Sequence, residues 1–136
     1  MSNIAQVVEM ERNLTTFKKG MEASGLNQVL SGEGPFTVFA PTDLAFNKLE
    51  GGTIKDLLLP ENKRQLTNLL NHHVICGKIS FRDLTNGGKL KTLNGKELLV
   101  RVIDGKTCID GSTIHTHDIQ TSNGVIHCLD TVLRSN

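Results

Sequence analysis

Residues 36–46 read Phe-Thr-Val-Phe-Ala-Pro-Thr-Asp-Leu-Ala-Phe, and the rest of the chain is organised around them. The β-branched and aromatic residues of 36–40 predict a short buried strand. Pro41 has no backbone N–H for a strand ladder, so the strand is expected to stop there. Thr42 or Asp43 can then accept hydrogen bonds from the free N–H groups of a following helix. A strand that leads directly into a capped helix joins two layers of a core.

A second stretch, residues 123–132, reads Asn-Gly-Val-Ile-His-Cys-Leu-Asp-Thr-Val and predicts a turn that leads into a strand. Upstream of it, Asn94-Gly95 between two apolar runs is the strongest hairpin signal. Asp104-Gly105 and Asp110-Gly111 mark further turns. Before Val74, apart from residues 36–40, apolar residues instead recur at helical spacing. The pattern therefore predicts an α+β fold with a helix-rich N-terminal half and a strand-rich C-terminal half.

Local signals also predict where the helices begin and end. Asn13 is expected to cap a helix that carries Phe17 on its apolar face. Gly25 suits the left-handed residue at the end of that helix. Pro60 fits the first turn of a longer helix that continues to about Asn71.

Composition excludes several classes of function. The chain has 136 residues with 15 basic and 14 acidic side chains, so it has no general attraction to nucleic acid or anionic lipid. Five phenylalanines, with no tryptophan or tyrosine, leave few platforms for stacking bases. No apolar run approaches the roughly 20 residues of a membrane span, and no signal peptide is visible at the N-terminus. We therefore expect no nucleic-acid partner and no transmembrane segment.

Three cysteines, Cys76, Cys108 and Cys128, lack the CxxC spacing of zinc and redox sites. Free cysteine is among the most buried residue types, so three reduced and mostly apolar thiols are one expectation. A single Cys108–Cys128 disulfide between neighbouring strands is the alternative, and it requires an oxidising compartment.

Sequence motifs for catalysis are absent. No glycine-rich phosphate loop lies between a strand and a helix, and no Gly-x-Ser-x-Gly elbow occurs. Cys128 adjoins His127, but adjacent strand residues point to opposite faces, so the two cannot form a nucleophilic pair through their own strand. We expect no enzymatic activity, no cofactor and no resident metal.

The histidines support one alternative hypothesis. His115 and His117 are two residues apart in an expected strand, so they share a face and can jointly hold a divalent metal. His72 or His127 would add a third ligand. The alternative function is therefore a soluble small-molecule or metal-binding protein with a His-lined cleft, although surface histidines also produce this spacing by chance.

Taken in order, five blocks of the chain resemble the successive signatures of fasciclin-like domains: residues 36–46, 73–79, 92–95, 118–119 and 123–132. Any one block would be a weak match, but the ordered set covers nearly the whole chain. The resemblance implies one domain over residues 1–136, folded as a β-wedge of about seven strands with several short helices packed against it.

The resemblance also implies a function. Fasciclin-like domains are adhesion and binding modules without a common catalytic activity, found outside the cell or at its surface. It implies a cell-surface or matrix protein as the partner, with a glycan as the second kind of partner. An extracellular, periplasmic or cell-surface location follows, while the absence of a visible signal peptide keeps a cytoplasmic location open. The oligomeric state is not indicated.

Two groups of residues follow from the matched blocks. After the long helix, family members often carry a Tyr-His pair that some animal members use for integrin contact; here His72 and His73 stand at these positions. The candidate partner-binding residues are His72, His73, Leu69, Leu70, Val74 and Ile75. The structural motif consists of Thr37, Phe39, Pro41, Thr42, Asp43, Phe46, Asp118, Asn123, Gly124, His127 and Asp130. Its carboxylates are expected to accept backbone N–H groups at turns and caps.

Overall fold

The computed structural model describes residues 2–49 and 53–133, and within them seven strands form one sheet in the order β2-β1-β7-β6-β5-β4-β3. In chain order the strands are β1 (Phe36–Pro41), β2 (Val74–Cys76), β3 (Lys89–Lys91), β4 (Glu97–Ile103), β5 (Lys106–Ile109), β6 (Ser112–Thr121) and β7 (Gly124–Leu129). β1 and β7 pair in parallel, and the other neighbouring strands pair antiparallel. The expected α+β wedge is confirmed.

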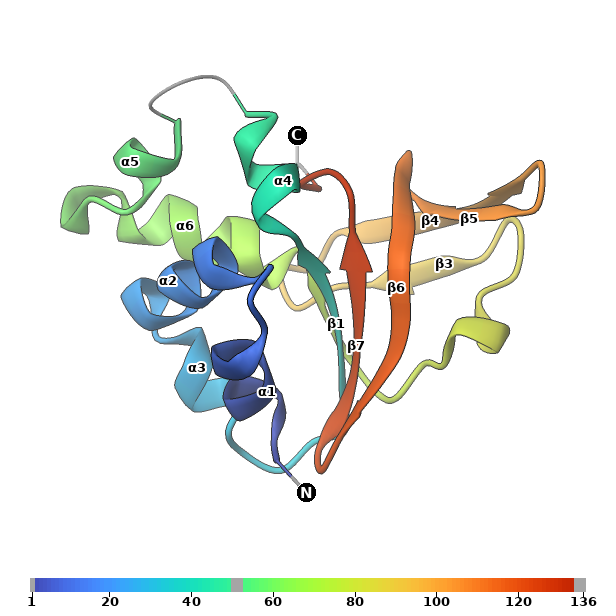
Figure 1. Cartoon of the computed structure of the whole chain (residues 1–136), viewed down its shortest axis with the longest axis horizontal. Helices are drawn as coiled ribbons and strands as arrows, with labels where there is room; N and C mark the ends of the chain where they lie inside the picture. Colours follow the sequence, from blue (N-terminus) through green and yellow to red (C-terminus); the bar gives the residue numbers. More distant parts are fainter. Residues whose placement is uncertain (1, 50–52, 134–136) are drawn as a thin grey trace.

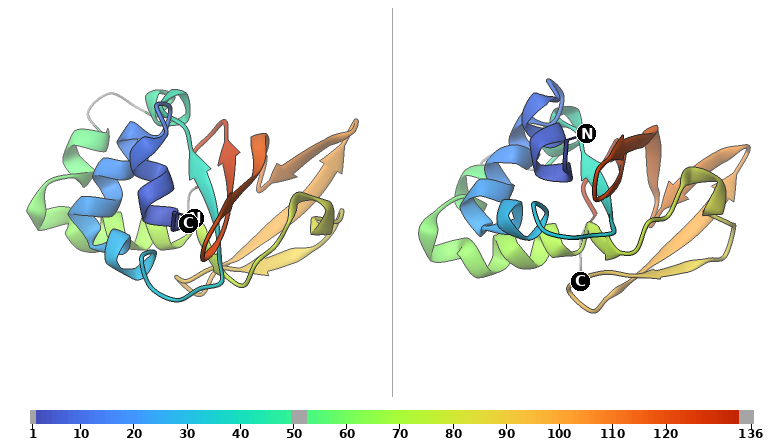
Figure 2. Two further views of the ribbon diagram at one scale, coloured as in Figure 1. Left: turned by 60° about the horizontal axis from the view of Figure 1, so that its bottom comes forward. Right: turned by 90° about the horizontal axis from the view of Figure 1, so that it is seen from below.

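The helices belong to the first half of the chain, apart from one short turn. They are α1 (Ile4–Met10), α2 (Thr15–Ser24), α3 (Leu26–Val29), α4 (Asp43–Asn47), α5 (Thr53–Leu57) and α6 (Lys63–Asn71), with 3-10 turns η1 (Pro60–Asn62) and η2 (Phe81–Asp83). Figures 1 and 2 show the α-helices gathered on one side of β1 and β7, while β3, β4 and β5 diverge on the other side.

The first core lies between the helices and one face of the central strands. Alternate residues of β1, Val38 and Ala40, face this side together with Ile126 of β7. Phe17 of α2 and Leu70 of α6 pack against them, and Phe17 has no exposed surface. The short helices therefore owe their persistence to this packing rather than to their own length.

The second core lies between the central strands β1 and β7 and the diverging strands β4 and β5. Phe39 of β1 and Leu129 of β7 point away from the helices and pack with Leu98, Val100 and Ile109 of β4 and β5. The central strands are therefore buried on both faces, as the apolar run at residues 36–40 predicts.

The hairpin predictions are confirmed. Asn94-Gly95 lies in the connection between β3 and β4, where Lys91 pairs with Glu97. Asp104-Gly105 and Asp110-Gly111 are two-residue loops, and all four residues have positive φ, between 48° and 86°. Positive φ at both central positions defines the type I′ turn that matches strand twist.

One of the predicted element ends is wrong, and three are confirmed. No side chain from Asn13 caps α2, although Gly25 ends this helix in the left-handed region with φ of 83°. Pro60 begins η1, which continues into α6 and ends at Asn71. As expected, β1 ends at Pro41, which pairs with Leu129 of β7.

Candidate partner-binding surface

The segment expected to contact a partner lies mostly in the interior. It runs from the last turn of α6 into β2, so the end of the helix and the start of this edge strand share one corner. His72 is 2% exposed, His73 0%, Leu70 1%, Val74 0% and Ile75 4%, which leaves Leu69 as the partly accessible member. The structure brings the six residues together, but five of them are buried.

His73 links three parts of the chain. Its Nδ1–H donates to the carbonyl oxygen of Leu69 at 2.8 Å, and its Nε2 accepts the N–H of Leu133 at 2.9 Å. The N–H of Phe39 donates to the backbone carbonyl of His73. Complete burial lowers the pKa of His73 to about 4, so the ring is neutral and both nitrogens act in structural hydrogen bonds.

His72 joins the end of α6 to the turn between β3 and β4. Its Nδ1 lies 3.3 Å from Oδ1 of Asn94, and Nδ2 of Asn94 donates to the carbonyl oxygen of Asn68. The ring meets that of His73 edge-on, with centroids 6.3 Å apart. Both His72 and His73 therefore stabilise this corner of the fold.

His127 closes a second corner. Asp118 has φ of 58° at an irregularity of β6, and its N–H donates to Nδ1 of His127 at 3.1 Å. The Nε2–H of His127 donates to the carbonyl oxygen of Ile79 at 2.8 Å. Burial lowers the pKa of His127 against the opposing effect of these partners, so it too is a neutral structural group. The N–H of Phe81 donates to Oδ1 of Asp118 and lowers the pKa of that carboxyl.

Asp43 caps a helix other than its own. Thr42 accepts from the N–H of Ala45 and caps α4, whereas Asp43 accepts from the N–H of Thr16 at 2.8 Å and from the hydroxyl of Thr15 at 2.6 Å. Partial burial opposes ionisation of Asp43, but these hydrogen bonds at the start of α2 outweigh it and lower the pKa. The carboxylate therefore links the start of α4 to the start of α2.

Asn123 and Gly124 hold the β6–β7 turn against earlier parts of the chain. Asn123 accepts from the N–H of Ile4 through Oδ1, and its Nδ2 donates to the carbonyl oxygens of Leu30 and Gly32. A Cβ at Gly124 would overlap the carbonyl oxygen of Phe36. Glycine is thus required at this position because the two backbones approach closely.

Asp130 fastens the segment after β7 to the start of β6. Its Oδ1 accepts from the N–H of Thr113 at 2.9 Å, and its own N–H donates to the carbonyl oxygen of Thr113. All three motif carboxylates therefore accept backbone N–H groups, as expected.

The other histidines do not assemble a cleft. His115 and His117 are exposed on β6, where the ring of His117 stacks on Phe81 with centroids 3.9 Å apart. His72 and His127 are buried in separate corners. Among residues 2–49 and 53–133, no group of three His, Cys, Asp or Glu side chains could hold a metal ion. The His-lined cleft therefore has no support in the geometry of the described chain.

The proposed Cys108–Cys128 disulfide is wrong on topology. β6 lies between β5, which carries Cys108, and β7, which carries Cys128. Two strand spacings amount to about 9.6 Å, which exceeds the roughly 7 Å limit for the Cα atoms of a disulfide. Both cysteines are free, and burial raises the pKa of the Cys128 thiol to about 11.

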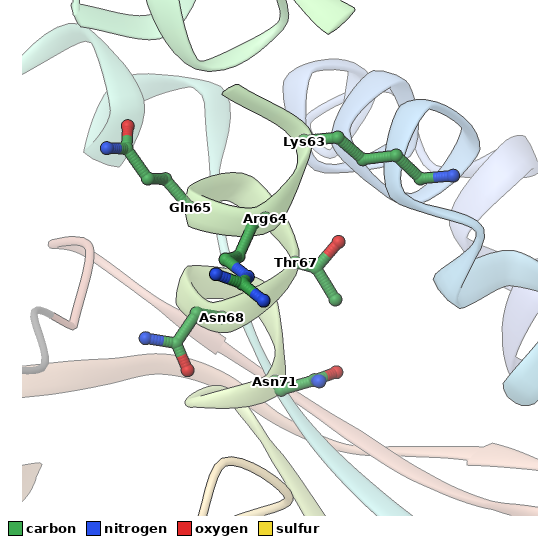
Figure 3. Close-up of a pocket in the computed structure, with 6 residues that line it drawn as sticks. All are labelled: Lys63, Arg64, Gln65, Thr67, Asn68 and Asn71. Carbon is green, nitrogen blue, oxygen red and sulfur yellow. The ribbon is translucent and has the colours of Figure 1, made fainter. Parts of the chain in front are cut away.

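An accessible surface lies on the outer side of α6. A hollow of about 700 Å³ runs along this helix and is lined by Lys63, Arg64, Gln65, Thr67, Asn68 and Asn71. Figure 3 shows these side chains spread around the exposed part of the helix. Within the described residues, no hydrogen bond or ion pair engages their polar side-chain groups. Helical periodicity could have indicated this surface, because polar residues fill the positions that the buried leucines leave open.

A second hollow, of about 610 Å³, lies near the start of β1 and the β6–β7 turn. We call it the loop cleft; it is lined by residues 31–35, Lys78 and residues 121–124. In Figures 1 and 2 the chain between α3 and β1 passes beside the β6–β7 turn. No turn or periodicity signal in the sequence predicts it, because its walls come from three distant segments.

A helix that crosses a membrane must be long and apolar. None of those within residues 2–49 and 53–133 is long and apolar enough to cross a membrane.

Comparison with known proteins gives consistent results. The sequence pattern of the fasciclin domain matches residues 12–135. Protein sll1483 of Synechocystis is 42% identical over 96% of this chain and 72% of that protein. Transforming growth factor-beta-induced protein ig-h3 of Sus scrofa is 34% identical over 97% of this chain but only 19% of its own length.

A solved structure supports the fold independently of close sequence identity. The chain aligns with a FAS1 domain pair from the insect cell adhesion molecule Fasciclin I at a TM-score of 0.87, with 20% identity, over 98% of this chain and 51% of the other. The order of the matched blocks, the sheet topology and these similarities agree: the chain belongs to the fasciclin domain family.

Proposed function

We propose that this chain is a single fasciclin-type domain over residues 1–136 that acts, without catalysis, as an adhesion or binding module outside the cell or at its surface. Its fasciclin-domain relatives suggest such a module. The partner is a cell-surface or matrix protein that contacts the outer side of α6, which we call the α6 face and define as Lys63, Arg64, Gln65, Thr67, Asn68 and Asn71.

The observation that carries the proposal is the division of α6 into two sides. Leu66 and Leu70 lie in the core, and the segment that follows the helix is buried with them. A partner of this region can therefore reach only the polar side of the helix. That side offers amide, hydroxyl and cationic groups that no other side chain of the described residues occupies, so binding breaks no internal hydrogen bond.

The α6 face also suits a protein partner. Its one arginine can make bidentate contacts with a carboxylate, and its amides can both donate and accept. The backbone at the C-terminal end of the helix is held by the contact of Asn94 with the carbonyl oxygen of Asn68, which reduces the ordering cost of binding there.

The experiment is a binding assay with the domain coated on beads under flow. The probes are immobilised collagen, laminin, fibronectin and the outer-envelope protein fraction of the native source. The variant Arg64→Glu combined with Asn68→Arg should weaken capture on a responsive probe at least about tenfold, or about 1.4 kcal/mol. The control Lys89→Glu changes an exposed lysine of β3, outside the α6 face, and should bind normally.

Equal capture by the double variant and the unmodified domain would place the partner surface elsewhere. Failure of every probe to retain the domain would contradict the adhesion function. Circular dichroism of both variants checks that the fold is retained, which is expected because the altered side chains are exposed.

A further inference from the structure

The loop cleft has fixed walls. Asn123 holds one wall to the other, because its Nδ2 donates to the carbonyl oxygens of Leu30 and Gly32, and its own carbonyl accepts the N–H of Phe36. A Cβ at Gly34 would overlap the carbonyl oxygen of Asn123. The two loops are therefore in backbone contact, and the cleft exists before any ligand arrives.

The rim of the cleft carries groups with free hydrogen-bonding capacity. Lys78, Glu33 and Ser122 are exposed, and no hydrogen bond or ion pair within residues 2–49 and 53–133 engages their side chains. In particular, Lys78 and Glu33 both line the cleft, and no ion pair joins them within the described residues. Ser31 donates its hydroxyl proton to Asn27 and keeps its lone pairs as acceptors.

This combination selects for one chemical class. The opposite charges of Lys78 and Glu33 cancel, so the rim has no net attraction for an ion of either sign. Ligand hydroxyls suit both groups, because a hydroxyl can accept a hydrogen bond from an ammonium or donate one to a carboxylate. The exposed ring of Pro35 adds an apolar surface against which C–H groups can pack. Several hydroxyls beside an apolar ring face describe a sugar.

The size of the cleft is consistent with such a ligand. Its volume of about 610 Å³ falls within the roughly 300–1,000 Å³ typical of small-molecule sites. We propose that the loop cleft binds a neutral saccharide. The proposal rests on the proposed function only in taking the chain as a binding module; it adds a saccharide to the protein partner proposed for the α6 face and uses residues separate from that face.

The test is a titration followed by two-dimensional ¹H–¹⁵N NMR of the whole chain. The probes are methyl glucoside, methyl galactoside and methyl mannoside, with methyl glucuronide as the acidic comparison. At least one neutral probe should produce saturable shifts of the amide signals of Gly32, Gly34 and Ser122, with affinity in the millimolar range. The glucuronide should bind no more tightly than the glucoside, because the rim carries no net charge.

Two variants separate rim chemistry from non-specific contact. Glu33→Ala and Lys78→Ala should each weaken binding of the responsive sugar about tenfold, the loss expected for one hydrogen bond to a charged group. Lys63→Ala, which alters the α6 face, should bind it unchanged. Both cleft residues are exposed and unpaired within the described chain, so these variants should fold normally.

The proposal is overturned if no neutral probe shifts the three amides, if only the glucuronide does, or if Glu33→Ala binds the sugar like the unmodified domain. These outcomes are independent of the flow assay. Loss of capture by the α6 variant with no sugar shifts would retain the protein-binding function and reject the saccharide site.

Discussion

Lowering the pH from 7 to 5 should destabilise this domain by about 2 kcal/mol through His73 alone. The ring is fully buried, with a pKa lowered from its ordinary value of 6.5 to about 4. Above pH 6.5 neither the folded nor the unfolded state holds the proton, so stability is constant. Below it, the unfolded state binds a proton that the folded state excludes, and stability falls until the pH passes the folded pKa. Integrating this difference from pH 7 down to pH 5 gives the figure of about 2 kcal/mol.

The structure explains why the folded state excludes this proton. Nε2 of His73 accepts the N–H of Leu133, and a protonated ring would place a second hydrogen in the same contact. His127 makes the same kind of contact with the N–H of Asp118, and burial lowers its pKa as well, so its contribution has the same sign. The depressed pKa values of Asp43 and Asp118 act at lower pH, because their stabilisation is complete above the ordinary value of 3.8.

The assay is urea unfolding, followed by circular dichroism, at half-unit steps between pH 7 and 5. The variant His73→Gln keeps a donor and an acceptor at the site but cannot take up a proton, so its stability should fall about 2 kcal/mol less over this range. The exposed His115, changed to Gln, serves as the control and should keep the full pH dependence. Direct NMR titration of the His73 ring gives a second measurement if the variant does not fold. A stability that stays flat from pH 7 to 5, or a ring that titrates near 6.5, would refute the reasoning.

Two further predictions concern the corners of the fold, and both are measured as urea unfolding midpoints at pH 7. Asp43→Ala should cost about 1 kcal/mol, because it removes the cap of α2, whereas Glu22→Ala on the exposed side of the same helix should cost little; equal midpoints for the two variants would argue against the cap. Gly124→Ala should cost about 1–3 kcal/mol, because its Cβ would meet the carbonyl oxygen of Phe36. Ser122→Ala in the adjacent turn is its control, and a shift of similar size there would point to a general sensitivity of the turn instead.

Features with local causes could be predicted from the sequence. The type I′ turns follow from Asp-Gly pairs, and the buried strand β1 follows from its run of apolar and β-branched residues. The ordered signature blocks extended these local features to the whole wedge. Each of these signals lies within a few residues of the structure that it determines.

Features that depend on distant segments could not be predicted in the same way. The cap of α2 comes from Asp43, which lies 28 residues beyond Thr15, so Asn13 was the nearest local candidate. The strand between Cys108 and Cys128 is known only once the order of the sheet is known. The burial of His72 and His73 likewise depends on how α6 packs, which a match to a signature block does not specify.

The described ends of the chain are attached at opposite ends of β7. The carbonyl of Ser2 accepts the N–H of Ser122 just before the strand begins, and Leu133 bonds to His73 beyond the point where it ends. The six residues of β7 between these points span about 20 Å. Tension applied between the two ends would therefore act along β7 and pull it lengthwise past both of its neighbours. The hydrogen bonds to β1 and β6 would bear that load together rather than open one after another.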